Sequence, residues 1–443
     1  MVEQHLISIW ATRKLGDLVE HQKGFAFKSS EYQPSGHPIV RVTNFTDRSI
    51  DMRGCNYLPF SDIKKYKAFS LCFGDVVIAT VGSWPSNPES VVGKVICVPK
   101  EADGALLNQN AVRLRATDEI DQKFLFYRLK NYDFQNYIVA GAQGSASQAS
   151  ITLKSIFDFT FPLPPLPEQK AIAHILGTLD DKIELNQQMN QTLEAIARAI
   201  FKSWFVDFDP VRAKMEGRQP AGMDAATADL FPDEFEDSHL GKIPKGWKTG
   251  CLGDIADNAR RGVQPENITL STPYIGLEHM PRRSIALVDW GTSSEVVSNK
   301  FWFKQGDILF GKLRPYFHKI GVAVLDGVCS TDILVVVPNL PDWYSLVLFQ
   351  VSSDEFVNYT NTTSTGTRMP RTNWNDMARY EIVIPTQEVA KVFNDRVQPL
   401  IQMIRENIFQ SRTLATIRDT LLPKLLSGEI RVRDAEKVVE VVT

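Results

Sequence analysis

Basic side chains gather beside aromatic ones in two short segments, "SDIKKYKAF" and "GKLRPYFHK". Lysine and arginine donate hydrogen bonds to phosphate oxygens and, from a suitably placed loop or strand end, to base edges. The net charge of the 443-residue chain is only −3, so nucleic acid would have to be bound by local patches of this kind. The predicted contacts in these segments are Lys64, Lys65, Lys67, Lys312, Arg314 and Lys319. For the first three, an ordinary solvated surface is the alternative.

Two loops rich in small hydrogen-bond donors, "GSASQASIT" and "STGTRMPRTNW", occupy matching places in the two halves of the chain. Glycine and serine allow the backbone to approach a phosphate closely, and arginine can reach a base edge. The predicted contacts in these loops are Ser145, Ser147, Gln148, Thr367, Arg368 and Arg371. Arg41, in "HPIVRVTNF", is a further candidate for base contact from a strand end, although arginine on an exposed strand is also common.

Motifs that would carry catalysis are not found. The Gly-Lys pair in "VVGKVICV" lacks the upstream glycine and the following Ser or Thr of a P-loop. No Gly-rich fingerprint opens a strand–helix–strand unit, and no Asn-Pro-Pro-aromatic run of the amino-methyltransferase kind occurs. The acids of "FPDEFEDSHLGK" lack a nuclease-like acid-x-lysine pattern, and the seven histidines are dispersed. We predict no catalytic residue and no metal site.

An internal repeat organises the elements that must position these residues. "KLGDLVEHQKG" resembles "CLGDIADNARRG", "LCFGDVVIATVG" resembles "FKQGDILFGKLR", and "GSASQASITLKSIFDFTFPLPP" resembles "GTRMPRTNWNDMARYEIVIP". The offsets stay near 220–240 residues, roughly, in the manner of a long-period repeat. Short β-branched runs bounded by Gly, Pro and Asn recur in both halves, with a helical piece before each donor-rich loop. Each half is therefore predicted to be an α+β unit rich in strands.

A long helix is predicted after each unit. Apolar residues alternate at spacings of three and four, which is typical of a coiled-coil seam. A helix of roughly 35–40 residues would be on the order of 55–60 Å long, which suits a spacer formed by two paired helices. The proline run "PLPPLPEQ" would launch the first helix, with a polyproline II ligand as the alternative. The predicted seam residues are Leu179, Ile183, Asn186, Leu193, Ile200, Leu400, Ile404, Asn407, Leu414 and Leu421.

Asn186 and Asn407 fall at matching positions of the two predicted seams. A buried asparagine costs stability but fixes the register of paired helices, so a matched pair would lock one alignment. Two asparagines that merely face solvent on an irregular seam are the alternative.

Cysteine usage and hydropathy bear on the compartment. The five cysteines are scattered without CxxC spacing, which indicates reduced thiols in a cytoplasmic protein. The first residues lack an apolar run long enough for a signal peptide, and runs such as "DILVVVP" are too short to cross a bilayer. We expect no contact with a membrane.

With this organisation, the chain resembles the specificity subunits of type I restriction–modification systems. The matching segments are "LPPLPEQKAIAHIL", "AIFKSWFVDFDPVRAKMEG", "IPKGWKTGCLGDIA" and "LLPKLLSGEIRV". They cover the helices and both unit boundaries, with weaker similarity inside the units. The second helix departs from the pattern because it lacks the proline-rich start, having only "VIPTQEVAKVF".

The resemblance implies a non-catalytic subunit that binds double-stranded DNA. Each unit would be a target recognition domain that reads one half of a split, asymmetric sequence, and the helices would form an antiparallel spacer. The spacer would dock two methyltransferase subunits, which restriction/translocase subunits then join. S-adenosylmethionine, ATP and magnesium would belong to those partners, with no cofactor in this chain.

The predicted domains are a first recognition domain at 1–164, a central helix at 165–215, an acidic Pro/Gly-rich linker at 216–246, a second recognition domain at 247–386, and a C-terminal helix and tail at 387–443. Two other functions remain open. One is a coiled-coil interaction scaffold that carries two β-rich binding modules, and the other is an enzyme with an active site in one unit.

Overall fold

The computed structural model of the chain describes residues 10–84, 91–145, 148–366 and 368–440. The chain folds into two compact units, of which unit 1 is Met1–Ile183 with Thr413–Thr443 and unit 2 is Glu184–Arg412. Two long helices, α6 (Leu166–Phe205) and α13 (Gln387–Ser427), each contribute one part to either unit.

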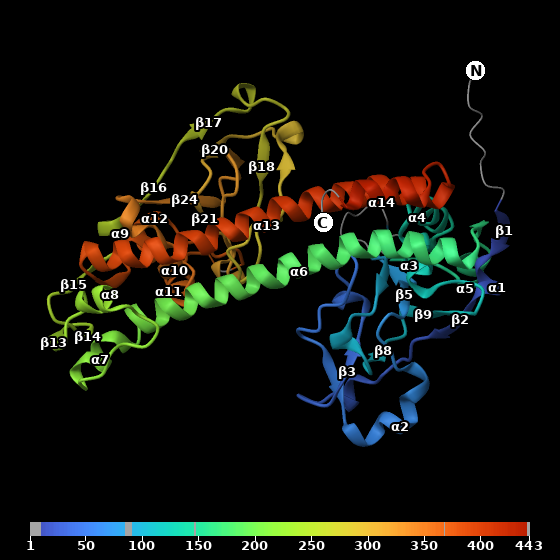
Figure 1. The fold of residues 1–443 in the computed structure, drawn as a ribbon, viewed down its shortest axis with the longest axis horizontal. Coiled ribbons are helices and arrows are strands. Elements are labelled where there is room, and N and C mark those ends of the chain that lie inside the picture. The colour runs from blue at the N-terminus through green and yellow to red at the C-terminus, as the bar shows by residue number, and fades with distance from the viewer. Residues whose placement is uncertain (1–9, 85–90, 146–147, 367, 441–443) are drawn as a thin grey trace. The chain divides into compact units, whose positions relative to one another are not determined.

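Unit 1 is built on a four-stranded antiparallel sheet with the strand order β2-β9-β5-β7 (Figure 1). A smaller sheet, β4-β3-β8, contains one parallel pair, β3 with β8, and a two-stranded ladder joins β1 to β12. The strands are β1 (Ala11–Lys14), β2 (Val19–Lys23), β3 (His37–Val40), β4 (Asn56–Leu58), β5 (Val76–Ala79), β6 (Val81–Gly82), β7 (Val95–Cys97), β8 (Leu106–Leu107), β9 (Ala111–Ala116), β10 (Gln143–Ser145), β11 (Gln148–Ser150) and β12 (Thr160–Leu163). Its helices besides α6 and α13 are α1 (Leu15–Leu18), α2 (Ile63–Tyr66), α3 (Gln122–Lys130), α4 (Tyr132–Ala140), α5 (Leu153–Phe157) and α14 (Val432–Glu440).

Unit 2 repeats this plan. Its central sheet has the order β16-β24-β21-β22, β18 pairs in parallel with β23, and β15 pairs with β25. The strands are β13 (Phe235–Ser238), β14 (Gly241–Pro244), β15 (Lys248–Cys251), β16 (Ala256–Asn258), β17 (Gly262–Val263), β18 (Pro273–Ile275), β19 (Gly291–Thr292), β20 (Lys300–Phe303), β21 (Ile308–Gly311), β22 (Ile320–Val322), β23 (Gly327–Cys329), β24 (Ile333–Pro338) and β25 (Glu381–Ile384). The helices are α7 (Asp209–Met215), α8 (Ala225–Asp229), α9 (Leu252–Ile255), α10 (Tyr344–Val351), α11 (Asp354–Thr362) and α12 (Trp374–Ala378). The predicted internal repeat and the α+β fold class are confirmed.

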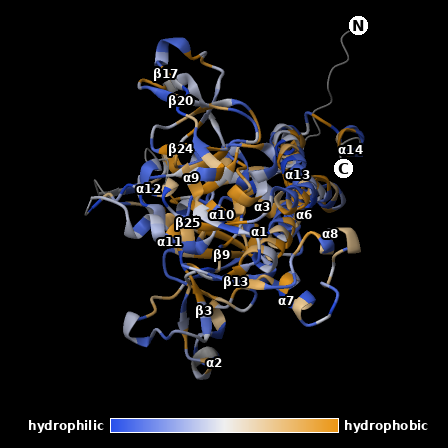
Figure 2. Ribbon diagram, turned by 90° about the vertical axis from the view of Figure 1, so that its left-hand side faces the viewer, coloured by the Kyte–Doolittle hydropathy of each residue, from blue (hydrophilic) through white to orange (hydrophobic). Residues whose placement is uncertain are grey.

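The core of each unit lies where its central sheet meets helices. Residues 308–311 of β21 are all buried, as are residues 76–79 of β5, because both faces of these central strands are covered. Hydrophobic residues gather on the strands and on the helix faces that cover them (Figure 2). In unit 1 the core includes Phe124 and Leu125 of α3 together with Leu176 and Leu179 of α6, so α6 is packed on the rest of the unit.

The two long helices run antiparallel. In unit 2, Asn186 donates to Gln410 and Ser411 at 2.9 and 3.2 Å, and Asn407 donates to Asn190 at 2.9 Å, so numbers rise along α6 as they fall along α13. Asn186 and Asn407 therefore do not bond to each other. Antiparallel pairing places Asn186 opposite a site about one turn beyond Asn407, and each asparagine meets a different polar partner.

The remaining predicted seam residues lie along the same helices. In unit 1, Leu179, Leu414 and Leu421 are buried in the core, and Ile183 packs against it. In unit 2, Leu193 and Ile404 are buried, with Ile200 and Leu400 packed against them.

Residues 216–246 were expected to form a linker, but most of them are folded into unit 2. They form α8 and the β13–β14 hairpin, and they bury Met223, Ala228 and Phe231 in its core. Phe231 contacts Trp204 of α6 edge-to-face, with ring centroids 5.1 Å apart. The linker prediction was wrong because it rested on the acidic, Pro- and Gly-rich composition and gave no weight to these apolar residues. Across the described part of the chain, no helix is both long and apolar enough to span a bilayer.

Candidate nucleic-acid interface

In unit 2 the basic segment "GKLRPYFHK" and the donor-rich loop "STGTRMPRTNW" are brought together by backbone pairing. The chain that follows β21 lies against the loop 365–372, where Leu313 pairs with Arg371. Arg314 N donates to Pro370 O at 2.7 Å, and Thr372 N donates to Lys312 O at 3.1 Å. Residues more than fifty positions apart in sequence thus form one surface. Arg368 is exposed in the same loop, whereas Thr367 lies outside the described residues.

The cations of this surface differ in whether their side chains already bond to other groups of the protein. Arg371 donates to Asp332 at 3.2 Å and is about half exposed, so its guanidinium can still reach outward. Lys319 donates to the carbonyl of Leu277, and burial lowers its pKa. Its ammonium therefore holds the loop at Leu277 in place. The acceptor is a backbone carbonyl, which every residue carries, so the spacing of residue types could not indicate this bond. Lys312 and Arg314 are half-buried.

Backbone strain is concentrated around the same surface. Among the described residues, four that are not glycine have positive φ, and three of them, Arg283 (φ 55°), Arg314 (φ 50°) and His318 (φ 52°), flank it. Such conformations cost about 1–3 kcal/mol each and cluster at functional sites. The neighbouring Arg282 was not predicted. It is exposed and lies over the Phe317 ring at 4.4 Å, an arrangement that stiffens a guanidinium; the pair "RR" in "MPRRS" was the available signal.

Unit 1 uses the same pairing scheme. β6 directly follows β5 and pairs with β11 of the β10–β11 hairpin, where Gly82 faces Ala149. Gln148 is exposed on β11. Ser145 closes β10, and Ser147 lies outside the described residues. The donor-rich loop therefore sits beside the continuation of the central strand in both units.

The other predicted contacts of unit 1 come from α2, from the residue after it and from the chain that follows β3. Lys64, Lys65 and Lys67 are exposed on or next to α2, with the Lys65 ammonium 4.8 Å from the Tyr66 ring centre. Tyr66 itself is buried against Phe25 and Phe27, so it supports the fold and offers no face to a ligand. Arg41 follows β3 and is half-buried.

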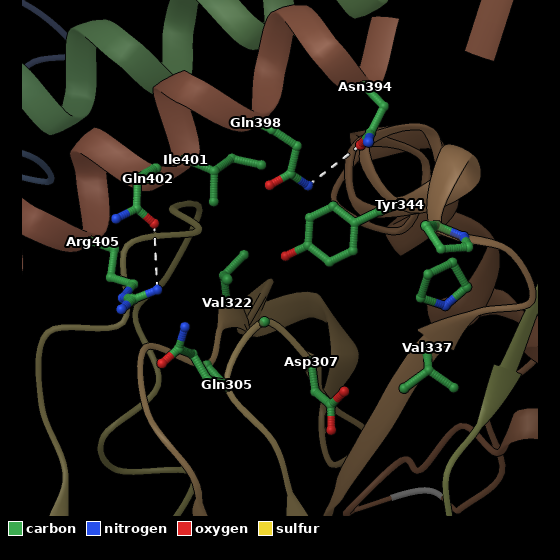
Figure 3. Close-up of a pocket in the computed structure, with 14 residues that line it drawn as sticks. Gln305, Asp307, Val322, Val337, Tyr344, Asn394, Gln398, Ile401, Gln402 and Arg405 are labelled. Carbon is green, nitrogen blue, oxygen red and sulfur yellow. Dashed lines mark hydrogen bonds between the residues drawn. The ribbon is translucent and has the colours of Figure 1, made fainter. Parts of the chain in front are cut away.

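A cavity of about 540 Å³ lies in unit 2 between the sheet ends and α13. Its lining is rich in amides, and the Tyr344 hydroxyl points into it near Gln398 and Val322 (Figure 3). Asp307, the only acid in the lining, is ion-paired with Arg261 at 2.6 Å. No group of three His, Cys, Asp or Glu within the described residues could hold a metal ion.

Comparison with known proteins agrees with this architecture. The family model for the type I restriction modification DNA specificity domain matches residues 8–195. The HindI specificity subunit of Haemophilus influenzae is 27% identical over 96% of this chain and 100% of its own length. Residues 8–195 thus match the type I specificity domain, and nearly the whole chain is similar to a type I specificity subunit. The MjaIX specificity subunit of Methanocaldococcus jannaschii is likewise 27% identical, over 74% of this chain and 73% of its own.

The fold of this chain is also that of a solved structure. The S subunit of a type I system from M. genitalium superposes with a TM-score of 0.54 at 17% identity, covering 96% of this chain and 98% of that one.

Proposed function

We propose that this protein is the specificity subunit of a type I restriction–modification system and that it reads a bipartite, asymmetric DNA sequence, one half with each unit. The observation that carries the proposal is the repeated pairing of a central strand's continuation with a donor-rich loop, at β6–β11 and at Leu313–Arg371. The frame is the same in both units, but the side chains differ. Two different readers on equivalent frames favour two different half-sites, and base contacts from such loops supply the discrimination.

The antiparallel helices are proposed to set the unread gap between the half-sites. Readers on one face of B-DNA need half-sites roughly a helical turn, about 34 Å, apart. α6 contains 40 residues, which corresponds to about 60 Å at 1.5 Å per residue. That length is sufficient for the proposed gap.

The partners are proposed from the family. Methyltransferase and restriction/translocase subunits would assemble on the helices, with two copies of the methyltransferase. S-adenosylmethionine, ATP and magnesium would act in those partners and not in this chain.

The decisive experiment is genome-wide sequencing of methylated sites in a strain with and without this chain. A split, non-palindromic motif that disappears with the gene is expected. Exchange of residues 1–160 for the first unit of another family member should then change one half of the motif only. If both halves changed, independent reading by the two units would be wrong.

Lengthening the helices tests the gap. Seven residues inserted in both helices, between Asn186 and Asn190 and in the facing stretch of α13, add roughly 10 Å, the rise of about three base pairs. The motif should keep both halves and widen its gap. A heptad inserted in α6 alone should abolish assembly, because the seam partners no longer match.

A further inference from the structure

The carboxylate of Glu194, on α6, is buried in unit 2 against the loop 282–285. Glu194 is 6% exposed, although carboxylates are seldom buried without partners. Its Oε2 accepts hydrogen bonds from Ser284 Oγ at 2.9 Å and from Ile285 N at 3.0 Å. Its Oε1 accepts from Arg198, one turn along the helix, at 2.7 and 3.0 Å. Each carboxylate oxygen thus accepts two hydrogen bonds, and two of the four come from a loop that precedes β19 in unit 2.

That loop carries the unpredicted arginines. Ser284 and Ile285 directly follow Arg282, which lies over Phe317, and Arg283, whose φ is 55°. Arg198 extends the attachment by donating to Ser352 O at 2.9 Å, the carbonyl that His318 also contacts. The Glu194–Arg198 pair therefore bonds directly to the loop 282–285 and shares the Ser352 carbonyl with His318, at the end of the strained segment 314–318.

Unit 1 has an equivalent attachment with different chemistry. The carbonyl of Arg48 accepts from Cys97 N at the end of β7, just as the carbonyl of Ile285 accepts from Val322 N at the end of the equivalent β22. Arg48 donates to Asp180 of α6 at 3.0 Å. Asp180 also accepts from Tyr127 and Arg418 at 2.6 Å each. The same loop position is fastened to the same helix in both units.

We propose that Glu194 and Asp180 are positioning residues. Through Glu194, α6 fixes the arginine-bearing loop 282–285 of unit 2, and through Asp180 it fixes the loop 41–48 of unit 1. The inference rests on the proposed function. A base-reading guanidinium must be held within a fraction of an ångström to form a bidentate contact, and a rigid helix is a better support than a loop. Loss of Glu194 would free the loop that bears Arg282, and loss of Asp180 would free the loop that starts at Arg41.

The test measures discrimination at each half-site separately. The full chain, assembled with its methyltransferase subunits, is titrated with the duplex found by methylation sequencing and with duplexes altered in one half only. Glu194→Gln replaces an acceptor oxygen with an amide that faces donors. It should reduce the affinity ratio between intact and altered sites roughly tenfold at the half read by unit 2, the value of about one good base contact. The ratio at the other half should stay within about twofold, and Asp180→Asn should give the mirror result.

Milder variants and a matched control keep the test sharp. Ser284→Ala removes one donor to Glu194, and Arg48→Gln removes the guanidinium that donates to Asp180 and Asp419. Both should act in the same direction as the acidic variants and replace them in the test if those fold poorly. Glu184→Gln, at an exposed position of α6, should leave both ratios unchanged. An equal loss at both halves, or no loss, would overturn the positioning role. Absence of discrimination by the wild-type complex would instead contradict the proposed function itself.

Discussion

Asn407 donates a hydrogen bond from Nδ2 to Oδ1 of Asn190, 2.9 Å away across the seam of α6 and α13 in unit 2. Asn186 finds Gln410 and Ser411 one turn away. These polar pairs interrupt an otherwise apolar contact and permit one alignment of the helices, because any slip would bury amides without partners.

Replacing one member of this pair should cost more than replacing both. Asn190→Leu leaves the half-buried Asn407 amide without its partner and should lower the free energy of unfolding of unit 2 by about 1–3 kcal/mol. The double variant with Asn407→Leu should recover most of that loss. Six of the eight tryptophans lie in unit 2, so denaturation followed by tryptophan fluorescence measures this unit. Additive losses would show that the two residues do not act together.

The segment 216–246 should behave as part of the core of unit 2. Phe231 is 1% exposed, so Phe231→Ala should destabilise the unit by about 3–5 kcal/mol. The adjacent Leu230 is 36% exposed and provides the control, since Leu230→Ala should cost well under about 1 kcal/mol. Similar effects of the two substitutions in urea unfolding would mean that the segment is a true linker.

His318 should make unit 2 sensitive to acid. Burial lowers its pKa below the usual 6.5, against the opposing effects of the Ser352 carbonyl and Asp354. The unfolded chain takes up a proton as the pH falls through 6.5 while the folded unit does not, so this stability is present above 6.5 and is lost below it. The slope is at most about 1.4 kcal/mol per pH unit.

The variant His318→Asn isolates this effect, because asparagine tolerates the left-handed backbone and does not titrate. Its stability at pH 8 reports the lost hydrogen bond to Ser352, and the dependence between pH 5 and 6.5 should be flatter than in the wild type. An unchanged slope in that range would assign the acid sensitivity to other groups.

The cations of the unit 2 surface should contribute to the salt dependence of DNA binding. Lys312→Ala and Arg368→Ala should each weaken binding and reduce the slope of log affinity against log salt by about one, if each contacts a phosphate. Lys391→Ala removes the same charge from α13, where the lysine is paired with Asp395, and is the control. A wild-type affinity for DNA that does not change with salt concentration would favour the interaction-scaffold alternative.

Local pattern alone determined the repeat, the strand-rich units and the two long helices. Landmarks such as "GDVVIATVG" and "GDILFGKLR" encode β5 and β21, equivalent strands of two sheets with the same order, and alternating three- and four-residue spacing encodes the helix faces. These signals are short-range, and they predict an element without its neighbours.

Only the tertiary structure decided which of these residues meet. It paired Asn407 with Asn190, committed Lys319 to the Leu277 carbonyl, buried Tyr66, and placed Glu194 beneath Ser284, ninety positions away. Such partnerships depend on helix register and on the packing of loops against a helix. Spacing along the chain fixes neither, because a contact between distant residues is set by the whole fold and not by the sequence around each one.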